Sequence, residues 1–136
     1  MLFRSRSISC AGIGLHSGKK VTLSLKPAPA GAGIRFRRTD LDGVEIPANV
    51  AHVGAVAYAT QLKLGEARVE TVEHLLAALA SSRIDNAIIE LNTPEVPIMD
   101  GSSAPFIYLV QEAGVRTLAE PRRYLKVTRQ IGRAHV

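Results

Sequence analysis

The spacing of apolar residues constrains the fold most, because it changes from the period of a strand to the period of a helix. In the first half of the chain, Val21, Leu23 and Leu25 alternate with polar residues, which is typical of a half-buried strand. Ile34 and Phe36 continue this alternation in a second stretch. Weaker strand patterns follow over residues 44–50 and 58–64.

A helical period replaces the alternation after Thr71. Val72, Leu75, Leu76 and Leu79 form one apolar stripe of an amphipathic helix. Thr71 is a suitable N-cap, because its hydroxyl can accept a hydrogen bond from an unpaired backbone N–H. The sequence therefore predicts a helix that begins directly after Thr71.

Two more elements follow this helix. Residues 84–92, IDNAIIELN, are almost continuously apolar, which is typical of a central strand. A second helix is predicted after a proline-punctuated loop, capped by Ser102 or Ser103, with its apolar stripe at Phe106, Leu109, Val110 and Ala113 and its end at Gly114. This order predicts an α+β fold, in which two helices pack on one face of an antiparallel or mixed sheet.

Composition narrows the classes of protein. The chain has 136 residues, of which 46% are hydrophobic, enough for one domain with a packed core. The single cysteine, Cys10, excludes an internal disulfide and a cysteine zinc cluster. No apolar run is long enough for a signal peptide or a membrane span, so we expect a soluble intracellular protein without an integral membrane segment.

Positive charge is concentrated near the start of the chain. The net charge is +5, and residues 1–42 hold eight Lys and Arg against two acidic residues. A basic face suits a phosphate-bearing ligand, although an ordinary solvated surface explains the charge equally well. We expect no nucleic-acid partner, because the chain has no recognition motif and only three Phe and three Tyr for stacking.

Glu73 and His74 lie side by side in the first turn of the predicted helix, and neither belongs to its apolar stripe. The helix dipole alone accounts for an acid at this end. It does not account for His74, because the dipole disfavours a cation there, and a neutral imidazole is a good metal ligand. A catalytic zinc takes three protein ligands and one water, with a carboxylate beside the water as general base. Only one ligand is visible here, so a purely structural role stays open.

The glycine-rich stretch AGIGLHSGKK does not fit the usual phosphate-binding motifs. Ile13 stands where the phosphate loop needs its first glycine, and Ser17 stands where the dinucleotide motif needs its last. We interpret the stretch as a connection between strands, from which His16 can face a ligand.

Three stretches, GIGLHSGKK, TVEHLLAAL and PEVPIMDGSSAPF, closely resemble the N-terminal half of the UDP-3-O-acyl-N-acetylglucosamine deacetylase family. The resemblance implies a cytoplasmic zinc-dependent amide hydrolase, which removes the N-acetyl group from UDP-3-O-acyl-N-acetylglucosamine in lipid A synthesis. It also implies that His74 ligates Zn²⁺, that Glu73 is the catalytic general base, and that Leu15 and His16 are substrate-binding residues.

The same resemblance implies two similar α+β domains with the site between them. We therefore expect residues 1–121 to form the N-terminal domain and residues 122–130 to be the first strand of a truncated second domain. The other zinc ligands and the general acid would belong to the missing C-terminal domain, so we expect this chain alone to be inactive. Residues 131–136, IGRAHV, are expected to be a non-native tail derived from a sequencing adapter. The alternative is a catalytically silent domain that contacts phosphate-bearing ligands through its basic face.

Overall fold

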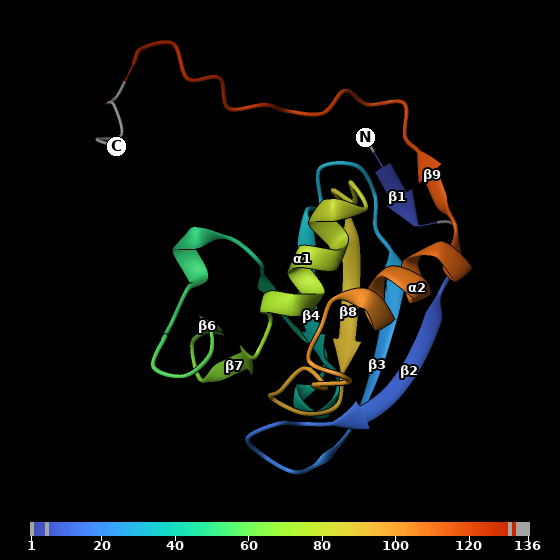
Figure 1. The fold of residues 1–136 in the computed structure, drawn as a ribbon, viewed down its shortest axis with the longest axis vertical. Coiled ribbons are helices and arrows are strands. Elements are labelled where there is room, and N and C mark those ends of the chain that lie inside the picture. The colour runs from blue at the N-terminus through green and yellow to red at the C-terminus, as the bar shows by residue number, and fades with distance from the viewer. Residues whose placement is uncertain (1, 5, 131, 133–136) are drawn as a thin grey trace.

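A mixed five-stranded sheet forms the body of the protein in the computed structural model, which describes residues 2–4, 6–130 and 132 (Figure 1). In spatial order its strands are β2 (Ile8–Ile13), β3 (Lys20–Pro27), β8 (Ala87–Leu91), β4 (Ile34–Arg38) and β5 (Val44–Pro47). Neighbouring strands are antiparallel except β4 and β8, which are parallel. The near-continuous apolar strand thus lies at the centre of the sheet, as its composition predicts.

Two helices, α1 (Glu73–Ser81) and α2 (Ala104–Ala113), lie side by side on one face of this sheet (Figure 1). The predicted α+β class, with two helices on one face of a mixed sheet, is therefore confirmed. Among the described residues, no helix is long and apolar enough to cross a bilayer.

Two short two-stranded sheets complete the fold. Strands β6 (Gln61–Leu64) and β7 (Ala67–Glu70) form a hairpin whose turn contains Gly65 at a φ of 58°, and β1 (Leu2–Arg4) pairs with β9 (Val115–Thr117). Short 3₁₀ turns occupy Thr39–Leu41 and Val50–His52.

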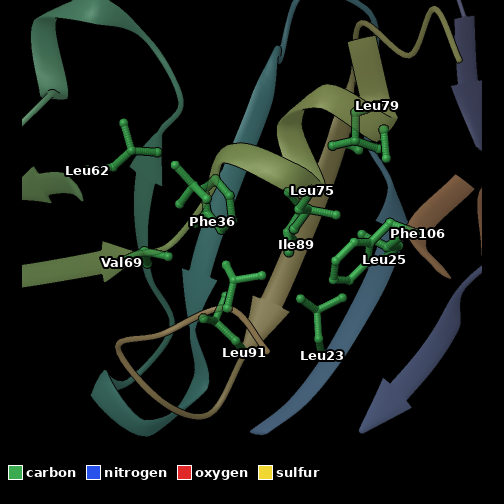
Figure 2. Packing of buried hydrophobic residues seen from close by; sticks show 14 of the residues in the cluster. Leu23, Leu25, Phe36, Leu62, Val69, Leu75, Leu79, Ile89, Leu91 and Phe106 are labelled. Atoms are coloured by element: carbon green, nitrogen blue, oxygen red, sulfur yellow. The ribbon is translucent and has the colours of Figure 1, made fainter. Parts of the chain in front are cut away.

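The core lies between the sheet and the two helices (Figure 2). It is built from the inward residues of the strands and from the apolar stripes of the helices: Val21, Leu23, Leu25, Phe36, Ile89, Leu91, Leu75, Leu79, Phe106 and Val110 are buried. The hairpin joins the same core through Leu62 and Val69. The position of the hairpin is therefore fixed by burial of these side chains. The loop before it reaches the beginning of α1, where the Thr60 N–H donates to the Glu73 carboxylate.

The basic residues on the opposite face of the sheet are paired with acids. Arg37 contacts Glu45 at 2.6 Å and Glu90 at 3.0 Å, and Lys26 contacts Glu90 at 2.9 Å. Arg35 lies 3.5 Å from Glu45. This pairing neutralises much of the positive charge on β3 and β4, which weakens the alternative of a phosphate-binding basic face.

The predicted cap of α1 is wrong. The helix begins at Glu73 after Val72, and Thr71 has a left-handed φ of 58°. Its hydroxyl donates to the Glu95 carboxylate at 3.4 Å instead of accepting from the helix. A distant buried acceptor therefore displaces the local cap that the sequence pattern favours.

The beginning of α2 agrees better with the sequence. Ser102 Oγ accepts a hydrogen bond from the Ala104 N–H at 3.2 Å, while the Ser103 hydroxyl donates to the His74 carbonyl at 2.8 Å. Gly114, with a φ of 75°, ends the helix as predicted.

Residues 122–130, which are predicted to be the first strand of a second domain, have no regular structure here, and no strand of the described chain pairs with them. Leu125 and Val127 are exposed, and Arg122 anchors the segment through a 2.7 Å ion pair with Asp85. Its assignment to a second domain stays a prediction. Apart from Gly132, the predicted adapter tail lies outside the described residues.

Candidate functional site

The residues singled out in the sequence meet around one loop, the segment of residues 94–98 between β8 and α2, which we call the 94–98 segment. Glu70, the last residue of β7, exchanges two backbone hydrogen bonds with this segment, at 2.7 and 3.0 Å. Ile98 N–H donates to the carbonyl of Ile13, at the end of β2, at 2.9 Å. The segment therefore joins the hairpin to the glycine-rich loop.

Glu95 is the buried centre of this arrangement, with a relative exposure of 1%. Its carboxylate accepts hydrogen bonds from the His16 N–H at 2.8 Å and from the Ser17 N–H at 2.9 Å. Burial alone raises the pKa of Glu95, but these bonds and the nearby charge of His16 outweigh it, so the pKa lies below 4.5. The group is ionised at neutral pH.

Two of the three glycines of the loop, Gly12 and Gly14, are explained by this packing, whereas Gly18 has a left-handed φ of 65°. A Cβ on Gly14 would collide with the carboxylate of Glu95 and the hydroxyl of Ser17. A Cβ on Gly12 would lie 2.8 Å from the Cβ of Pro97. Gly12 and Gly14 are therefore needed because the 94–98 segment lies against the backbone of the loop. This agrees with the interpretation of the loop as a connection and not a phosphate loop.

His74 lies half-buried between the beginnings of α1 and α2. Its ring meets the ring of Phe106 edge-on, with centroids 5.1 Å apart, and its Nε2 lies 3.0 Å from the carbonyl oxygen of Pro97. A carbonyl oxygen only accepts, so Nε2 must carry the hydrogen. In its neutral form, the ring then keeps a lone pair on Nδ1. The helical period predicts His74 outside the apolar stripe of its helix, but it does not predict that Phe106 of α2 covers one side of the ring.

Glu73 is the first residue of α1, and its side chain is exposed. Burial raises the pKa of its carboxyl, but the Thr60 N–H that donates to Oε1 and the charge of His74 contribute to a net lowering below 4.5. The carboxylate is thus ionised and held in place at neutral pH. Thr60 was missed because it lies in the loop before β6, where no sequence pattern marks it.

Asp100 is a second carboxylate near the imidazole. It accepts from the N–H and the hydroxyl of Ser102 at 2.9 and 2.8 Å. These bonds hold the pKa of Asp100 below 3.8, and the charge of His74 lowers it further. Asp100 lies within the family-like stretch PEVPIMDGSSAPF, but no sequence pattern distinguishes it from an ordinary turn residue.

His16 and Leu15 are placed differently. His16 lines a depression of about 280 Å³, whose other walls come from Ala55, Ala57, Tyr58, Ala59, Gln61 and Glu70. Leu15 is 58% exposed and lies outside this lining. The structure therefore brings His16 to a ligand-accessible hollow, whereas Leu15 is an exposed apolar residue next to it in the chain.

The fit to a metal ion is partial. Among residues 2–4, 6–130 and 132, no three His, Cys, Asp or Glu side chains come close enough to hold a metal ion together. His74 itself suits one position of a zinc site, because a ligating histidine usually donates its other ring N–H to a carbonyl or carboxylate. A catalytic zinc takes three protein ligands, and in the described chain His74 is a candidate for one of them.

The fold and the site together define an α+β domain in which an imidazole, His74, and the carboxylates of Glu73 and Asp100 gather around the beginnings of its two helices. A sequence profile of the UDP-3-O-acyl N-acetylglycosamine deacetylase family matches residues 5–135, and the chain belongs to this family.

Three relatives named UDP-3-O-acyl-N-acetylglucosamine deacetylase illustrate the similarity. The chain is 52% identical over 125 residues to the protein of Legionella pneumophila strain Corby, with coverage of 91% of this chain and 41% of the relative. It is 51% identical over 126 residues to that of Pseudomonas entomophila, covering 92% and 42%. It is 54% identical over 127 residues to that of an Anaeromyxobacter species, covering 93% and 41%. The chain thus spans about two fifths of the length of these relatives.

Proposed function

We propose that this chain is the N-terminal part of a zinc-dependent deacetylase that removes the N-acetyl group from UDP-3-O-acyl-N-acetylglucosamine during lipid A biosynthesis in the cytoplasm. Family membership supports the choice of reaction. The observation that carries the proposal is the Nε2–H bond of His74 to the Pro97 carbonyl, because it makes Nδ1 the ring nitrogen that can bind a metal in the residue next to Glu73.

In this proposal each residue has a separate task. Zinc, when bound, supplies a Lewis acid that polarises the acetyl carbonyl and acidifies a water molecule. His74 is one of its ligands. Glu73, ionised and held by Thr60, accepts the proton of the attacking water. The Pro97 carbonyl fixes the tautomer and the orientation of the imidazole.

His16 and Leu15 are proposed to contact the substrate. The depression that His16 lines, about 280 Å³, lies just below the usual range for small-molecule pockets and would take only part of a UDP-linked sugar. A second wall is therefore needed. Leu15 and Tyr58, which are 58% and 94% exposed, provide apolar surface that a missing C-terminal domain would cover.

The proposed domain division follows from the same reasoning. Residues 1–121 would be the N-terminal domain, and residues 122–130 would become a strand only when the second domain supplies partners for their backbone. The remaining zinc ligands would also come from that domain. One imidazole alone holds zinc weakly, so the 136-residue chain is expected to show no deacetylase activity.

A fusion protein tests this proposal. Residues 1–121 of this chain are joined to the C-terminal remainder of the Legionella pneumophila relative, and zinc content and deacetylase activity are measured. We expect an active fusion, in which His74→Ala lowers bound zinc and Glu73→Ala lowers kcat by about 10²–10⁴-fold while zinc stays bound.

His52→Ala is the matched control, because His52 is also half-buried and bonds to Asn49 at 2.6 Å, but it has no place in the proposed site. The proposal would be contradicted if the fusion folds but is inactive. It would also be contradicted if the His74→Ala variant keeps as much zinc and activity as the His52→Ala variant.

A further inference from the structure

We propose that Glu95 is a positioning residue of this site: its carboxylate fixes the loop that carries Leu15 and His16 relative to the helix start that carries Glu73 and His74. The roles of those four residues in binding and catalysis rest on the proposed function. The attachment of the loop to the helix start through Glu95, which we call the tether, rests only on the contacts of Glu95.

The tether joins three parts of the chain that are distant in sequence. The carboxylate of Glu95 accepts hydrogen bonds from the N–H groups of His16 and Ser17, which are 79 and 78 residues away. It also accepts one from the hydroxyl of Thr71, which is 24 residues away. Thr71 immediately precedes Val72, on which α1 begins. A single side chain thus contacts both the glycine-rich loop and the approach to the proposed catalytic helix.

The chemistry of Glu95 favours positioning over simple packing. A buried carboxylate is costly unless donors satisfy its oxygens, and here each oxygen accepts one backbone N–H of the loop. Charged acceptors make shorter and stronger hydrogen bonds than neutral ones. Loop and carboxylate therefore depend on each other, because the carboxylate is tolerable only while the loop stays in this position.

The loop has few other fixed contacts. Its own backbone bonds join Gly14 to Lys19 and Gly18 to Gly14, which shape the turn but do not attach it to the rest of the protein. His16 and Leu15 are both exposed. The carboxylate of Glu95 is thus the described group that holds His16 at the wall of the depression.

The 94–98 segment also holds the imidazole, but through a different atom. The Pro97 carbonyl accepts from His74 Nε2 at 3.0 Å, two residues beyond Glu95. Removing only the Glu95 carboxylate should release the loop and leave His74 in place. This separation makes the proposal testable without an activity measurement.

The test uses Glu95→Gln in the 136-residue chain, because glutamine keeps the shape but has only one accepting oxygen. We expect hydrogen exchange at the His16 and Ser17 amides to accelerate by about tenfold or more. The nitrogen chemical shifts of the His74 ring should stay unchanged. Glu90→Gln is the matched control, because it removes a carboxylate of β8, five residues away, that contacts Lys26 and Arg37 instead.

A second variant covers the case in which Glu95→Gln fails to fold. Gly14→Ala places a methyl group against the Glu95 carboxylate and should open the loop from the other side, with the same faster exchange at both amides. The proposal is overturned if neither variant exchanges His16 and Ser17 faster than Glu90→Gln does, or if the His74 shifts change as much as the loop amides.

The fusion protein separates this proposal from the proposed function. In it, Glu95→Gln should raise KM by about tenfold and change kcat by no more than about twofold, because the released loop contacts substrate and not the reacting atoms. An equal fall of kcat would overturn the positioning role. An inactive wild-type fusion would overturn the proposed function alone, and amide exchange would still decide on the tether.

Discussion

Glu90 and Glu95 are five residues apart, yet the protein compensates their charges in opposite ways. Glu90 lies on the open face of β8 and contacts two cations, Lys26 and Arg37. Glu95 is buried and contacts backbone N–H groups and one hydroxyl. Glu90 adds ion pairs between strands that backbone hydrogen bonds already align. Glu95 instead holds loops that have few other contacts to align them.

The largest expected difference between the two carboxylates is in stability. Glu95→Ala leaves two loop amides without their acceptor and opens a cavity, so we expect the free energy of unfolding to fall by about 3 kcal/mol. Glu90→Ala is expected to cost about 1 kcal/mol, because its partners stay partly hydrated. Urea unfolding of both variants measures the difference. Equal losses would mean that the two charges are compensated in the same way.

Acid titration should give a smaller effect that sharpens the comparison. The pKa of Glu95 and that of Glu90 both lie below 4.5 in the folded protein, despite the opposing effect of burial. The unfolded chain therefore binds more protons than the folded chain in this window, so stability is complete above the unfolded pKa and falls as the pH drops through the folded pKa.

Urea unfolding between about pH 6 and pH 3 should show this loss in the wild type. Glu95→Gln should flatten the pH dependence, because the titrating group is gone, and Glu90→Gln should flatten it too. A wild-type curve that is flat over this range, or variants that keep its full slope, would contradict the shifted pKa values.

The elements that the sequence predicted correctly are those whose signal is local. Alternation located β3 and β4, the apolar run located β8 at the centre, and the helical stripe located α1 with Leu75 and Leu79 buried. Each pattern arises because one face of an element meets the core, so neighbouring residues in the sequence carry the information.

The site could be predicted only in part. Glu73 and His74 stood out because they leave the apolar stripe, and this position is visible in the sequence. The role of Glu95 was not visible, because its partners lie up to 79 residues away and the 94–98 segment resembles an ordinary proline-rich loop. For the same reason the cap at Thr71 was wrong, since the competing acceptor is Glu95 itself.

Salt should give the smallest effect and the most direct test of the comparison. The contacts of Glu90 with Lys26 and Arg37 are partly exposed, with Lys26 at 40% side-chain exposure, so mobile ions can screen them. The contribution of Glu90, measured as the stability difference between wild type and Glu90→Gln, should shrink by about 0.5 kcal/mol between low salt and 1 M NaCl. The corresponding difference for Glu95→Gln should stay constant, because its donors are backbone amides next to a buried carboxylate that ions do not reach. If the Glu95 difference fell with salt as much as the Glu90 difference, the carboxylate would be held by long-range charge, and the short hydrogen bonds to His16 and Ser17 would not be what holds the loop.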